Sequence, residues 1–84
     1  AGLFTWSVSG GDPAPLAREL SALPGIDMVA PFGSSVHVGG HDAAALEAAI
    51  APFRERPGLV WRRDEPTLED VFIDLMSRSK DNFR

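Results

Sequence analysis

The sequence contains no cysteine. The chain can therefore form neither a disulfide framework nor a thiolate nucleophile, and chemistry that depends on either is excluded. A composition without cysteine fits a cytosolic setting, where structural disulfides are rare.

Long hydrophobic runs are also missing. No apolar stretch approaches the roughly 20 residues that cross a bilayer as a helix, so we expect no direct insertion into a membrane. Residues 1–30 do not combine a basic start with an apolar run, and no signal peptide is predicted. Because the chain begins with Ala1 rather than Met, we expect it to be excised from a longer protein.

Basic residues are in the minority. Eight lysines and arginines stand against twelve aspartates and glutamates, which gives a net charge of −4. This is the wrong sign for a surface that binds phosphates, so nucleic acid is disfavoured as a partner. The 84 residues support a single domain, residues 1–84. A chain of this length buries only roughly 60 to 65% of its unfolded surface, and a deep catalytic cleft is not expected.

Four short segments alternate apolar and polar residues, which is typical of half-buried strands. In the first segment Phe4, Trp6 and Val8 share one side. In the last segment Leu59 and Trp61 are expected to face inward. The two central segments read as a hairpin that turns at residues 33–35. The four expected strands lie within residues 2–9, 26–32, 35–38 and 59–63.

Two segments between these strands have the spacing of helices. Asp12 suits the N-cap and Pro13 the first position of one helix, and Asp42 begins the other. Pro52 removes a backbone hydrogen bond at a cost of about 3 kcal/mol, so the second helix is expected to kink or end near it. The residues expected to face the core are Leu16, Leu20, Leu23, Leu46, Ile50 and Phe53.

The order strand, helix, hairpin, helix, strand predicts an α+β fold. It is the βαββαβ order of a ferredoxin-like sandwich, in which two helices cover one face of a four-stranded antiparallel sheet. The other face of the sheet must be wet or covered, and an additional C-terminal helix and tail, residues 67–84, follows the last strand.

The C-terminal helix has a clear start and one apolar side. Thr67 can cap its N-terminus, and Glu69 and Asp70 place negative charge in its first turn. Basic residues gather toward its end, at Arg78, Lys80 and Arg84. The apolar stripe, at spacings i, i+3, i+4, i+7 and i+8, consists of Leu68, Val71, Phe72, Leu75 and Met76.

Two interpretations of this helix remain open. It can pack its stripe on its own sheet or helices, or part of it can face another domain, and both can hold for different sides of one helix. Ile73 lies off the stripe and hints at a second contact.

The segment EPTLEDVFIDLM, residues 65–76, resembles the signature that closes the ATP-binding subunits of ABC transporters, particularly those of the ABC-2 or drug-resistance export type. The Leu-Pro-Gly sequence at Leu23, Pro24 and Gly25, followed by two strands, is also similar to that family. The residues that match the terminal signature are Pro66, Leu68, Glu69, Asp70, Val71 and Phe72.

The resemblance implies a C-terminal regulatory domain that follows the nucleotide-binding domain and does not hydrolyse ATP. No Gly-x-x-x-x-Gly-Lys-Ser/Thr loop occurs in the sequence, so we expect this fragment to be no enzyme and to hold no cofactor, while the parent would be an ATPase that uses ATP and Mg²⁺. The implied partners are the nucleotide-binding domain of the same chain or a second ATPase subunit, and a membrane permease. The implied location is the cytoplasmic face of the membrane. The candidate interaction residues are Leu68, Glu69, Asp70, Val71, Phe72 and Ile73.

The sequence gives weaker support for a metal site or a catalytic site. A metal site built from His37, His41 and Asp42 is disfavoured, because Gly39 and Gly40 leave its geometry undefined, and a polar strand and turn is the favoured interpretation. No Ser/His/Asp set can be placed, so no catalytic residue is predicted.

Two other classes of function stay open for a βαββαβ domain. One is a small-molecule sensor of the ACT-like kind, which would bind its ligand where two sheets pair. The other is an acylphosphatase-like hydrolase, which needs an asparagine beside a phosphate-binding loop. The single asparagine, Asn82, lies in the tail and argues against it.

Overall fold

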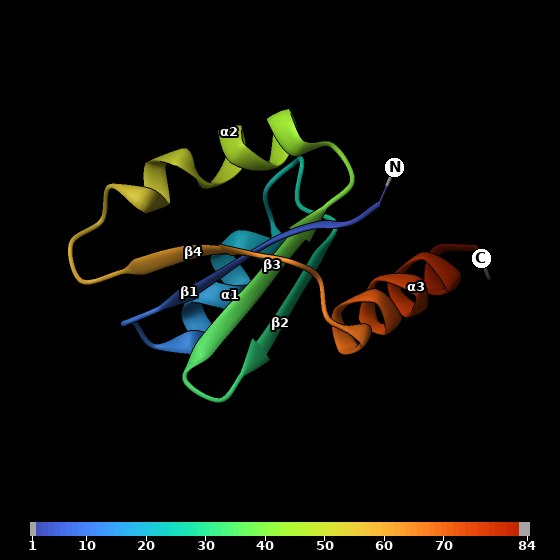
Figure 1. Ribbon diagram of the computed structural model, residues 1–84, viewed down its shortest axis with the longest axis horizontal. Coiled ribbons are helices and arrows are strands. Elements are labelled where there is room, and N and C mark those ends of the chain that lie inside the picture. Colours follow the sequence, from blue (N-terminus) through green and yellow to red (C-terminus); the bar gives the residue numbers. More distant parts are fainter. Residues whose placement is uncertain (1, 83–84) are drawn as a thin grey trace.

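The computed structural model describes residues 2–82, and side chains from residue 2 to residue 77. This part of the chain has an α+β fold with a four-stranded antiparallel sheet and three helices. Figure 1 shows the elements in chain order: β1 (Phe4–Ser9), α1 (Pro13–Ser21), β2 (Met28–Phe32), β3 (Ser35–Gly40), α2 (Ala43–Arg54), β4 (Val60–Asp64) and α3 (Leu68–Asn82).

The strands lie in the order β2-β3-β1-β4, and every neighbouring pair is antiparallel. In the register of the central strands Trp6 lies opposite Val38, and Val8 opposite Val36. Residues directly opposite in antiparallel strands point to the same face, so these four side chains share one side of the sheet. The element order and the sheet are compatible with a small fold of the ferredoxin-like type.

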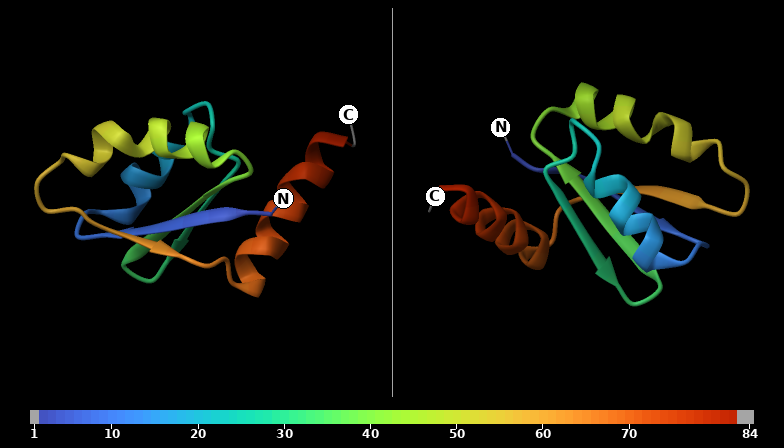
Figure 2. Two further views of the ribbon diagram at one scale, coloured as in Figure 1. Left: turned by 45° about the horizontal axis from the view of Figure 1, so that its top comes forward. Right: turned by 180° about the vertical axis from the view of Figure 1, so that it is seen from behind.

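The main core lies between this face of the sheet and helices α1 and α2, which both lie on that side (Figure 2). The residues predicted to face the core from the two helices do so. Leu23 packs against the core as well, but from the turn that follows α1. Trp6 and Trp61 meet edge to face at 6.4 Å between ring centroids. The buried residues of the main core are Trp6, Val8, Leu16, Leu20, Val36, Val38, Leu46, Ile50 and Phe53.

The predicted N-cap residues stand at the starts of α1 and α2, but only one of them makes a capping hydrogen bond. The Asp42 carboxylate accepts hydrogen bonds from the backbone N–H groups of Ala44 and Ala45, so it caps α2. Asp12 stands at the N-cap of α1 but makes no side-chain capping bond. Pro52 lies inside α2, which continues to Arg54, so the helix ends near the proline as expected.

The second face of the sheet carries an apolar patch on β2 that lies outside the main core. Met28 lies opposite Gly39 and Ala30 opposite His37, so both point away from Val36 and Val38. Met28 is nevertheless 2% exposed and Ala30 7% exposed. At Gly39 a Cβ atom would come within 3.0 Å of the Leu3 side chain and 3.3 Å of the Met28 sulfur, so the glycine makes room for this packing. The second face is therefore partly covered.

Helix α3 supplies that cover, because it contacts β2 and β3 on the side away from α1 and α2. Figures 1 and 2 show it standing apart from the other two helices, at one end of the molecule. None of the helices in the described part of the chain is long and apolar enough to cross a membrane.

Candidate interaction surface on the C-terminal helix

Helix α3 begins with a reciprocal cap, as the sequence predicts for Thr67. The backbone N–H of Asp70 donates to Oγ1 of Thr67 at 3.1 Å, and the backbone N–H of Thr67 donates to Oδ2 of Asp70 at 2.9 Å. Two donors that the first turn leaves without helical partners are satisfied in this way. The cap also fixes the direction in which the Asp70 side chain points.

The second oxygen of Asp70 anchors the helix to the sheet. Oδ1 lies 2.8 Å from Nδ1 of His37 on β3, and the Asp70 residue is 1% exposed. An ionised carboxylate only accepts hydrogen bonds, so the contact suits the His37 tautomer that has its proton on Nδ1. The ring of Phe32 packs against the His37 ring at 4.4 Å between centroids and holds it from the β2 side. The three side chains form a partly buried contact between β2, β3 and α3.

A second histidine–aspartate pair lies one helical turn further along α3. Nε2 of His41 lies 3.0 Å from both carboxylate oxygens of Asp74, which is 3% exposed. The backbone N–H of His41 donates to Oδ2 of Asp27 at 2.9 Å, so the turn after β3 is itself held in place. Asp70 and Asp74 are four residues apart and lie on the same side of α3. That side, with the half-buried Ile73 between them, faces the domain.

The apolar stripe of α3 faces the opposite way. Of the two interpretations left open by the sequence, the one in which the stripe packs against its own sheet or helices is wrong, because all five side chains are exposed. The exposed fractions are 83% for Leu68, 37% for Val71, 61% for Phe72, 47% for Leu75 and 57% for Met76. Asp70 bonds His37 on β3 and Asp74 bonds His41 in the turn after it, and a helix that turns these carboxylates inward must turn the stripe outward.

The six predicted interaction residues therefore fall into two groups. Leu68, Glu69, Val71 and Phe72 are exposed, whereas Asp70 is buried and Ile73 half-buried against the domain. Sequence reasoning treated His37 and His41 as polar residues of a strand and a turn and missed their carboxylate partners. The available signal was the spacing of Asp70 and Asp74 on one helix face. The sequence also predicts basic charge at the end of the helix. Arg84 and the side chains of Arg78 and Lys80 lie outside the described part of the structure.

Within residues 2–77 no group of three or more histidine, cysteine, aspartate or glutamate side chains is placed to hold an ion. Asp42, the third residue of the disfavoured metal set, turns its carboxylate to the start of α2 instead.

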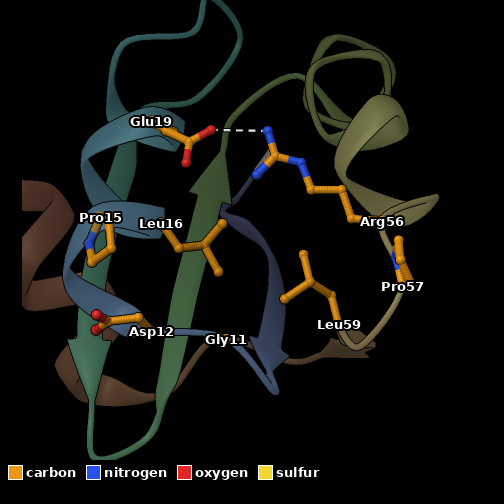
Figure 3. Close-up of a pocket in the computed structure, with 8 residues that line it drawn as sticks. All are labelled: Gly11, Asp12, Pro15, Leu16, Glu19, Arg56, Pro57 and Leu59. Carbon is orange, nitrogen blue, oxygen red and sulfur yellow. Dashed lines mark hydrogen bonds and ion pairs between the residues drawn. The ribbon is translucent and has the colours of Figure 1, made fainter.

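A separate shallow pocket of about 220 Å³ lies between α1 and the segment that joins α2 to β4 (Figure 3). On one wall Nη2 of Arg56 donates to Oε1 of Glu19 at 2.8 Å. This hydrogen bond, helped by the charge of the guanidinium, lowers the pKa of the Glu19 carboxyl below its ordinary value. The guanidinium also lies 4.2 Å from the centroid of the Phe53 ring. Arg56 is thus engaged within the chain by one hydrogen bond and one ring contact.

Comparisons with protein families, with curated proteins and with solved structures found no match for this chain. The candidate surface is therefore defined by its own geometry. It consists of a helix held by two buried carboxylates that bond His37 and His41, with an apolar stripe whose side chains are 37 to 83% exposed.

Proposed function

We propose that this chain is a non-catalytic accessory domain of an ABC transporter ATP-binding protein, and that the apolar stripe of α3 is its contact with another domain or subunit. The domain would take the form of a ferredoxin-like sandwich with an additional C-terminal helix. In the parent protein a separate domain would bind ATP and Mg²⁺, and the stripe would help to couple that ATPase to its permease at the cytoplasmic face of the membrane.

The observation that carries the proposal is the outward orientation of α3. Exposed apolar side chains are ordinary when scattered, but five of them on one helical face form a contiguous patch, and such patches mark interaction sites. The inward face of the same helix is held by two buried carboxylates, so the stripe has a defined position on the domain. A fixed, exposed apolar ridge is suited to docking.

The second support is the terminal segment itself. Pro66, Leu68, Val71 and Phe72, which carry the resemblance, are all exposed, so their side chains are available to a partner. Asp70, also part of that segment, has a role within the domain through its cap and its bond to His37. The same short motif thus combines residues that fix the helix with residues free to bind.

The test uses the intact parent subunit with Phe72→Glu, because Phe72 is exposed and the change should leave the domain folded. We expect export to fall at least tenfold while ATP binding stays within twofold of the unsubstituted protein. The matched control is Val60→Glu, which places the same charge at an exposed apolar residue on β4. Unchanged export with Phe72→Glu, or an equal loss with Val60→Glu, would reject the proposal.

A further inference from the structure

We propose that the partner of the stripe is a second copy of this chain, and that two α3 helices pair antiparallel about a two-fold axis through their stripes. This names the partner of the surface described above and rests on the proposed function to that extent. The inference itself is drawn from the shape, area and charge of the helix.

The shape of the molecule allows such a pair. Its extents are 39 × 26 × 23 Å, and α3 lies at one end of it, apart from α1 and α2 (Figures 1 and 2). The stripe points away from the sheet that α3 covers. Two copies can therefore join through their α3 helices while the sandwiches stay apart, which matters because each copy carries a net charge of −4.

The spacing of the stripe suits packing against a like helix. Residues at i, i+3, i+4, i+7 and i+8 form a seam that fits ridges into grooves on a facing helix. Taking about 150 to 200 Å² for a side chain of this size, the exposed fractions leave roughly 500 Å² of apolar surface on each copy. A pair that covered the whole stripe would bury at most about 1,000 Å², which is below the roughly 1,200 Å² of stable interfaces and falls in the range of weak, reversible association.

The charge pattern selects the antiparallel arrangement. Glu65, which precedes α3, and Glu69, in its first turn, are exposed, whereas the sequence of the last turns contains Arg78 and Lys80 and one acidic residue, Asp81. An antiparallel pair brings the acidic start of one helix toward the basic end of the other and opposes the two helix dipoles. A parallel pair would place Glu69 beside its own copy. A membrane surface is a poorer occupant, because the acidic domain is repelled by anionic lipids.

Sedimentation equilibrium of the 84-residue chain, from about 10 µM to about 1 mM, tests the pairing. We expect the average mass to rise with concentration from the monomer value of 9.0 kDa towards twice that value. Met76→Glu should remain monomeric throughout, whereas Val60→Glu, whose side chain is equally exposed at 57%, should pair as the unchanged chain does. A monomer at every concentration, or pairing that survives Met76→Glu, would overturn the proposal.

Cross-linking keeps the test independent of how well a charged variant folds. Phe72 is the central residue of the stripe, so it lies nearest to its own copy across the two-fold axis. Since the chain has no cysteine, Phe72→Cys should cross-link to itself with a short bifunctional maleimide, and Val60→Cys should not. Equal cross-linking of the two variants would contradict the pairing. Stripe-dependent binding of monomers to phosphatidylcholine vesicles, without self-association, would assign the stripe to a membrane and also overturn it.

These outcomes separate the pairing from the proposed function. A chain that stays monomeric rejects the pairing and leaves the proposed function to the export experiment. Conversely, a chain that pairs, in a subunit that exports normally with Phe72→Glu, would reject the proposed function and keep the pairing.

Discussion

The imidazole of His37 and the carboxylate of Asp70 lie 33 residues apart in the chain and 2.8 Å apart in the structure. This contact decides which side of the C-terminal helix faces the sheet. Because Asp70 also closes the cap with Thr67, one buried side chain sets both the start of the helix and its rotation. The apolar stripe faces outward as a result.

Replacing Asp70 should therefore destabilise the domain. Asp70→Ala removes a bond to a charged group, worth about 1.5 to 3 kcal/mol, and a cap worth about 1 kcal/mol. Because His37 is partly exposed, we expect a total loss of about 2 to 4 kcal/mol in the free energy of unfolding, measured by urea denaturation. Glu69→Ala, one residue away and exposed, is the control and should change the free energy by less than about 0.5 kcal/mol. Equal effects of the two substitutions would contradict the anchoring role of Asp70.

Replacing Phe72 by alanine should change the free energy of unfolding only slightly. A buried phenylalanine costs about 3 to 5 kcal/mol when replaced by alanine, but Phe72 is 61% exposed, so Phe72→Ala should cost less than about 1 kcal/mol. Leu46→Ala, in the fully buried core of α2, should cost about 2 to 5 kcal/mol under the same conditions. A loss above about 2 kcal/mol for Phe72→Ala, in a chain kept monomeric by dilution, would place the ring inside the domain instead.

The bond between Glu19 and Arg56 gives a prediction for pH. The folded-state pKa of Glu19 is lowered, chiefly by the hydrogen bond from Arg56, so the pair stabilises the fold above the unfolded-state pKa and loses its effect as the pH falls through the folded-state pKa. Arg56→Gln should return the pKa of Glu19 toward its ordinary value, as followed by NMR titration of the carboxyl carbon. Arg18→Gln, which makes the same change of charge on α1, should leave the pKa of Glu19 below its ordinary value. Equal shifts in the two variants would assign the effect to net charge rather than to the bond.

The α+β class and the main core could be predicted from the sequence because they depend on local periods. The alternation of apolar and polar residues in β1 and the helical spacing of apolar residues in α2 each specify which side faces inward. Val8 and Ile50 are buried as expected. The cap at Thr67 was also predictable, since it joins residues three positions apart.

The orientation of α3 could not be predicted in the same way. Hydrophobic spacing shows that a helix has an apolar side, and in a small domain that side normally turns inward. Here the histidines of β3 and the turn after it require carboxylates opposite them, and this long-range pairing outweighs the stripe. The burial of Met28 and Ala30 could not be predicted for the same reason, because the helix that covers them begins about 40 residues later in the chain.

The rotation of α3 can be measured directly by cysteine reactivity, because the chain has no cysteine of its own and single variants have no background. The reaction of Phe72→Cys and of Ile73→Cys with a thiol reagent would be compared in dilute protein. We predict that Phe72→Cys reacts at nearly the rate of an unfolded control and that Ile73→Cys reacts at least tenfold more slowly, since Ile73 lies between the two buried carboxylates. The reverse order of rates would mean that the stripe faces the sheet, and the proposed interaction surface would not exist.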